Sequence, residues 1–107
     1  MDKAEIEDLF AELGSVSVRR MFGGHGVYHQ GLIIAVEVDG EILLKADAET
    51  APLFEAAGAQ RWAYAGKKGK PISMPYWSVP DYAADDPEDS ARWARLAFEA
   101  SMRAAKT

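Results

Sequence analysis

The residue types that most often do chemistry are sparse in this sequence. His25 and His29 are its two histidines. In an extended segment they would lie about 13 Å apart, at roughly 3.3 Å per residue, so a shared zinc ion would need a tight bend at Gly26. Ser73 lacks the flanking glycines of a nucleophile elbow, and no cysteine is present to act as a nucleophile or metal ligand. We therefore expect no catalytic residue, no metal site and no cofactor.

Two glycine-containing segments have a partial likeness to nucleotide-binding motifs. Residues 24–26 read Gly-His-Gly, but His29 stands where the dinucleotide fingerprint has its third glycine, and no helix is expected to open there. Gly69-Lys70 is followed by Pro71, where a phosphate-binding loop needs a Ser or Thr for magnesium. Neither segment predicts a nucleotide site. A bend between two strands explains the glycines of the first segment.

A run of carboxylates precedes the expected last helix. Asp86 is suited to the N-cap and Pro87 to the first helical position. Glu88 and Asp89 are favourable near the positive end of the helix dipole. This pattern predicts the start of a helix, and these roles explain the carboxylates better than cation binding or acid–base catalysis does.

The basic residues are the strongest candidate for a binding surface. Residues 61–80 contain one arginine, three lysines and no acidic residue, a sum of +4 in a chain of net charge −5. Lysines beside aromatic side chains are typical of nucleic-acid surfaces, whereas aromatics on paired strands are more often core residues. We therefore rank an acidic protein partner ahead of direct contact with nucleic acid. The candidate interaction surface consists of Arg61, Lys67, Lys68, Lys70 and Arg20.

Hydrophobic periodicity indicates the elements that would position these residues. Apolar residues at three- and four-residue spacing predict helices that end at Gly14 and Gly58, and a last helix that begins at Pro87. Alternating residues predict strands between the helices, with a bend at Gly23-Gly24. The expected strands are residues 16–22, 32–38, 41–46, 61–64 and 72–78. The order is α-β(3)-α-β(2)-α, an α+β two-layer sandwich with a mainly antiparallel sheet.

The clearest local signal is a hairpin closed by Asp39-Gly40, a pair suited to a type I′ turn. A two-residue turn predicts that Ile33, Ala35, Ile42, Leu44 and Ala46 share one face. The opposite face is also apolar, and a two-layer domain covers only one face with helices. A second copy or another element of the chain must then cover it, and we expect a homodimer. The candidate dimer face consists of Ile34, Val36, Val38 and Leu43.

Length and composition set the limits of the molecule. A chain of 107 residues corresponds to one domain, residues 1–107, and its 49% hydrophobic and 27% charged residues are typical of a globular protein. The N-terminus is acidic, unlike a signal peptide, and no apolar run approaches the roughly 18 residues of a membrane span. We expect a cytoplasmic protein without membrane contact.

Several collinear segments resemble the N-terminal domain of the TfoX/Sxy family. The resemblance implies a secretion-chaperone-like fold, α-β(3)-α-β(2)-α, which agrees with the order given above. It also implies regulation of competence genes at promoters, together with the cAMP receptor protein, and no established catalytic residues. The segments that carry it are Arg19–Gly24, Gly26–Tyr28, Leu44–Asp47, Phe54–Gly58 and Gly69–Met74.

The family's competence regulators carry a second, helical domain, and this chain ends at Thr107 without room for it. We therefore expect a stand-alone, non-enzymatic interaction domain that regulates transcription through protein contacts, with a transcription factor or another acidic protein as partner. The alternative is a small-molecule-binding or enzymatic protein with a pocket between sheet and helices.

Overall fold

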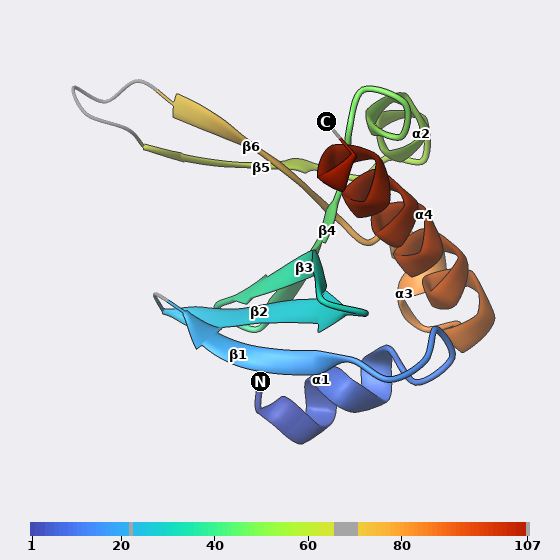
Figure 1. Cartoon of the computed structure of the whole chain (residues 1–107). Helices are drawn as coiled ribbons and strands as arrows, with labels where there is room; N and C mark the ends of the chain where they lie inside the picture. Colours follow the sequence, from blue (N-terminus) through green and yellow to red (C-terminus); the bar gives the residue numbers. More distant parts are fainter. Residues whose placement is uncertain (22, 66–70, 107) are drawn as a thin grey trace.

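The computed structural model describes residues 1–21, 23–65 and 71–106, with the side chains of residues 64, 65 and 71–73 left aside. The described part forms one antiparallel sheet of six strands with helices packed against it (Figure 1). The strands are β1 (Ser17–Met21), β2 (Gly24–His29), β3 (Leu32–Val38), β4 (Glu41–Lys45), β5 (Arg61–Ala65) and β6 (Pro71–Ser78). The helices are α1 (Lys3–Leu9), α2 (Ala51–Ala56), α3 (Asp81–Ala84) and α4 (Pro87–Ala105).

The strand order β1-β2-β3-β4-β6-β5 confirms the expected α+β class. The expected strand count is one short, because four strands precede α2 instead of three. Gly23 has φ 70°, which lets the chain turn back from β1 into β2, and Gln30-Gly31 makes a second turn into β3. A Cβ at position 24 would lie 1.9 Å from the Glu37 carbonyl oxygen. Strand β2 can therefore approach β3 this closely only because residue 24 is a glycine.

The β3–β4 hairpin forms as its turn sequence predicts. Asp39 and Gly40 have φ 51° and 82°, and Val38 pairs with Glu41 as Val36 pairs with Leu43. Because side chains alternate along a strand, this register places Leu43 and its neighbour Leu44 on opposite faces of the sheet.

A β-bulge in β3 changes which residues share a face at one end of the hairpin, and the prediction is wrong there. Val27 pairs with Ala35 but Tyr28 pairs with Ile33, so Ile34 is an extra residue on its strand. Ile34 is consequently fully buried in the main core, while Ile33 packs on the opposite face. The prediction that Ile34 belongs to the candidate dimer face is therefore wrong. The hydroxyl of Ser101 on α4 donates to the Ile33 carbonyl oxygen at this irregularity.

The main core lies between the helices and one face of the sheet. Ile6 of α1, Phe54 of α2 and Trp93 of α4 all belong to it. The Phe54 ring lies 4.7 Å from the Trp93 ring and 6.2 Å from that of Trp77 on β6, measured between centroids. Figure 1 shows α4, in red, beside β3 and β4 on the right of the view. We call this side of the sheet the helix face.

An ion pair ties the C-terminal part of α4 to the loop after β4. Arg103 Nε lies 2.6 Å from Asp47 Oδ2, and an Arg103 terminal nitrogen donates to Oδ1 at 3.1 Å. Asp47 also accepts from the backbone N–H groups of Glu49 and Thr50. Hydrogen bonds from Arg103, which outweigh the effect of burial, lower the pKa of Asp47 to about 2.

Candidate functional site

The side of the sheet that points away from the helices carries a second, smaller apolar cluster. Val36, Leu43 and Tyr76 are its buried members, and all its described residues come from strands. We call this side the outer face. Of the predicted dimer-face residues, Val36 and Leu43 are thus buried within a single chain, while Val38 stays partly exposed. The outer face consists of Arg19, Tyr28, Ile33, Val36, Val38, Leu43, Lys45, Trp62, Met74 and Tyr76.

Two cations lie over aromatic rings on the outer face. The Arg19 guanidinium carbon is 5.2 Å from the centre of the Tyr28 ring, and Lys45 Nζ is 5.7 Å from that of Tyr76. Trp62 meets Tyr76 edge to face, with centroids 6.3 Å apart. Tyr28 pairs with Ile33, which packs against the cluster that contains Tyr76, so both rings belong to one surface. Burial, and after it the nearby Tyr28 phenol, raises the pKa of Tyr76. Each cation is therefore held beside the apolar cluster.

The sequence-predicted basic residues do not gather into one described patch. Lys67, Lys68 and Lys70 lie outside the described residues. Arg61 is exposed on β5, where its Nε donates to the Met74 carbonyl oxygen at 3.0 Å. Arg20 is exposed on β1, and β1 and β5 are the two edge strands of the sheet, so these arginines stand at opposite edges.

Sequence reasoning missed Arg19 and Lys45, which among the described residues are the two cations that lie over aromatic rings. Alternation along each strand could have placed Arg19 on the side of Met21 and Lys45 on the side of Leu43, but it does not relate the two strands to each other. Their aromatic partners depend on strand pairing, which requires the turn at Gly23 and the β4–β6 contact.

The two histidines make separate contacts. His25 Nδ1 lies 2.7 Å from Glu37 Oε1, and the Gly40 N–H donates to Oε2 of the same carboxylate at 2.7 Å. Burial works to raise the pKa of Glu37, but these hydrogen bonds and nearby positive charge leave it below its ordinary value. His29 Nδ1–H donates to the Ser15 carbonyl oxygen at 2.8 Å. Within residues 1–21, 23–65 and 71–106, no group of three or more potential ligands could hold a metal ion.

The carboxylates before the last helix take the expected structural role in part. The Asp86 side chain accepts from the N–H groups of Glu88 and Asp89, at 2.9 and 3.4 Å. Asp81 instead begins the short helix α3, which the sequence pattern did not predict. Its carboxylate lies at a pocket on the helix face.

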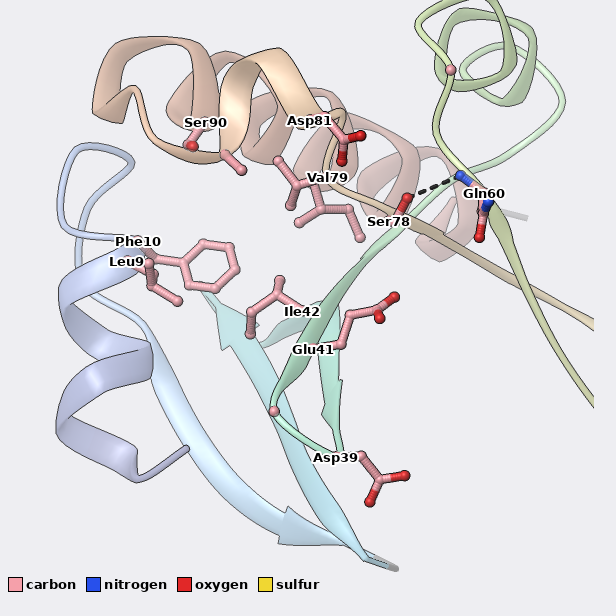
Figure 2. Close-up of a pocket in the computed structure, with 14 residues that line it drawn as sticks. Leu9, Phe10, Asp39, Glu41, Ile42, Gln60, Ser78, Val79, Asp81 and Ser90 are labelled. Atoms are coloured by element: carbon pink, nitrogen blue, oxygen red, sulfur yellow. Dashed lines mark hydrogen bonds between the residues drawn. The ribbon is translucent and has the colours of Figure 1, made fainter.

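This pocket has a volume of about 640 Å³ and opens between α1, β4 and α3 (Figure 2). Leu9 and Phe10 at the end of α1 lie on one side, and Ile42 and Leu44 of β4 lie at the base. Asp39, Glu41 and Asp81 also line it. A smaller pocket of about 510 Å³ lies beside the His25–Glu37 pair.

The fold and these surfaces define a small α+β domain with helices on one face of its sheet and a mixed apolar and cationic surface on the other. No helix among the described residues is long and apolar enough to cross a bilayer. The family model of the TfoX N-terminal domain matches residues 8–101, and the chain therefore belongs to this family, which is associated with competence regulation and is not a known enzyme family. Comparison with curated proteins gave no match.

Proposed function

We propose that the protein is a non-enzymatic, cytoplasmic interaction domain that regulates transcription by binding an acidic surface of a protein partner through its outer face. The observation that carries the proposal is the placement of Arg19 and Lys45, each over a tyrosine ring, beside one apolar cluster. Family membership supports the regulatory role.

The composition of the outer face favours a protein partner. Tyrosine, tryptophan, methionine and arginine are enriched in protein interfaces, and all four occur here. Positively charged side chains beside an apolar patch complement an acidic partner and speed its association. Nucleic acid is disfavoured, because Val36 and Leu43 occupy the middle of the surface and Tyr76 is only 7% exposed, which leaves little ring face for base stacking.

The test compares transcripts from three strains: a deletion of the gene, an Arg19→Glu/Lys45→Glu variant, and a Lys3→Glu/Arg95→Glu control. The control reverses two exposed charges on α1 and α4, away from the outer face. At matched protein levels, we expect the outer-face variant to reproduce the transcript changes of the deletion and the control to resemble the wild type. A deletion without transcript changes would refute the regulatory role, and a wild-type pattern in the outer-face variant would refute the surface.

A second copy of the chain is the other possible occupant of the outer face. Light scattering across concentrations, with a Val38→Glu variant beside the wild type, separates the two. Val38 suits this test because it is the predicted dimer-face residue that keeps partial exposure. A wild-type monomer supports the acidic partner, whereas a dimer lost in the folded variant would assign the face to a second copy.

A further inference from the structure

We propose that the protein partner adds an extended acidic segment to the open edge of β1, as a further strand of the sheet. This inference rests on the function proposed above and names the element through which the partner binds. Strand β1 stands at one end of the strand order, so among the described residues it pairs with β2 alone. Figure 1 shows β1 as the lowest strand of the view. An open strand edge is a template on which another chain can pair.

The register shows which backbone groups of β1 point to the open edge. The residues on either side of the β3–β4 turn form the hydrogen-bonded pair that closes it, because the turn has two residues with positive φ. Hydrogen-bonded and non-hydrogen-bonded pairs alternate along an antiparallel ladder. His25 and Glu37 are therefore a hydrogen-bonded pair, and the backbone of His25 does not bond that of its β1 partner Arg20. The N–H and C=O groups of Arg20, and of Val18 two positions before it, consequently face the open edge.

Helix α1 leaves this edge accessible. Ile6 of α1 and Val18 of β1 share the main core, so the helix packs against the helix face of the strand. Arg20 lies further along the same face and stays exposed.

The two edges of the sheet differ in regularity. Strand β1 pairs with β2 residue by residue over its whole length, without a bulge or a proline. Strand β5 has an irregular register between Arg61 and Ala63, and Arg61 Nε donates to the Met74 carbonyl oxygen on β6. A bulge protects an edge from pairing with another chain, whereas a regular edge permits it. Strand β1 is therefore the edge suited to strand addition.

The charges of β1 favour an acidic segment over a second copy of the chain. Arg19 and Arg20 are adjacent and exposed, and they lie on opposite faces of the sheet. A strand with two adjacent acidic residues could place one carboxylate beside each arginine, because its side chains alternate in the same way. Pairing β1 with its own copy would instead bring together two arginines from each chain. Like charges on facing strands are destabilising.

Met21 extends the apolar surface of the outer face to this edge. It is 43% exposed, and its Sδ would lie 2.9 Å from a Cβ at position 26, close to Tyr28 and Ile33. Its side chain therefore lies over Gly26 on the outer face. An apolar residue opposite Met21 would continue this contact into the added strand. Together with the two arginines, this predicts a segment in which adjacent acidic residues stand between apolar ones.

The test is a titration of the purified full chain with the capped peptide Val-Glu-Glu-Val-Thr, followed through the backbone amide signals of β1. One matched probe is the same peptide N-methylated at the residues that would pair with Val18 and Arg20, which keeps the charge but removes two backbone donors. The other is Val-Lys-Lys-Val-Thr, which has the opposite charge. We expect saturable shifts with the first peptide and much weaker binding of the other two.

Two substitutions at one position separate the backbone from the charge. Arg20→Gln should weaken binding of the acidic peptide about threefold, because an exposed charge contributes little. Arg20→Pro removes the same charge and the outward N–H, and should weaken binding roughly tenfold beyond Arg20→Gln. Proline is tolerated on an edge strand where its N–H would face solvent, and circular dichroism checks that both variants are folded.

The inference is overturned by the absence of saturable shifts up to about 1 mM peptide, by equal binding of the N-methylated peptide, or by equal affinities of the two folded variants. The N-methylated peptide uses the wild-type chain, so it decides the question even where the proline variant fails to fold. A wild-type dimer that is lost in folded Arg20→Pro would also overturn the inference and assign the edge to a second copy.

The peptide titration and the transcript comparison fail independently. Peptide binding without transcript changes would support the edge as a binding site and refute the regulatory role. Transcript changes without peptide binding would support the regulatory role and refute strand addition.

Discussion

Strand β4 separates two surfaces of opposite character. On the helix face, Ile42 and Leu44 lie at the base of a pocket that Phe10 and Val79 also line. On the outer face, Leu43 belongs to the small apolar cluster, and Lys45 lies over Tyr76 beside it. The side chains of Ile42 and Leu44 thus face the pocket and those of Leu43 and Lys45 face the outer side, because successive side chains of a strand point to opposite faces. One short strand therefore presents an apolar side to the main core and a mixed apolar and cationic side to the outer face.

The largest expected effect is the loss of stability when either of the two adjacent leucines, one on each face of β4, is shortened to alanine. Leu44→Ala leaves a hole in the main core and should lower the free energy of unfolding by about 2–5 kcal/mol. Leu43→Ala, in the smaller cluster, should fall toward the lower end of that range because fewer neighbours surround it. Urea unfolding of both variants measures the difference. Equal losses would show that the outer cluster is packed as firmly as the main core.

An intermediate effect is expected where α4 contacts the β3 bulge. Ser101→Ala removes a buried hydroxyl that donates to the Ile33 carbonyl oxygen. An unsatisfied buried acceptor costs about 1–3 kcal/mol of unfolding free energy. Ser17→Ala, at an exposed position on β1, is the control. A loss no larger than that of the control would mean that the bulge is held by packing alone.

The smallest effect, and the one that depends on pH, concerns the Asp47–Arg103 pair. The folded-state pKa of Asp47 lies at about 2, below its ordinary value of 3.8. Stabilisation from this shift is complete above the ordinary pKa and is lost as the pH falls toward about 2. Asp47→Asn should therefore be less stable than the wild type at neutral pH, with a gap that narrows between about pH 4 and 2. Urea unfolding across this range tests the sign, and a constant gap would contradict it.

Local signals predicted the hairpin and the capped last helix well, because each depends on a few adjacent residues. Asp39-Gly40 adopts the positive φ angles its turn needs, and Asp86 caps α4. The bulge at Ile34 could not be predicted in this way. Residues 32–36 are continuously apolar, so no alternation shows on which side each one packs.

The candidate surfaces depend on contacts between distant segments, and this limits what the sequence alone could predict. Grouping the basic residues by their closeness in sequence favoured the 61–80 segment, whereas pairing in the sheet brings Arg19 to Tyr28 and Lys45 to Tyr76. The pocket between sheet and helices was anticipated only as a general alternative. Its lining joins the Asp39 turn to Asp81, 42 positions further along the chain, through tertiary packing.

The bond between Ser101 and Ile33 also bears on how the protein is made. Ser101 follows Ile33 by 68 positions, so the bulge in β3 gains this hydrogen bond only after α4 has been synthesised. Until α4 arrives, the apolar helix face of a nascent sheet is open to solvent and to other chains. Completion of this fold is therefore expected only after α4 has left the ribosome, and a product truncated before α4 would be a substrate for chaperones and proteases.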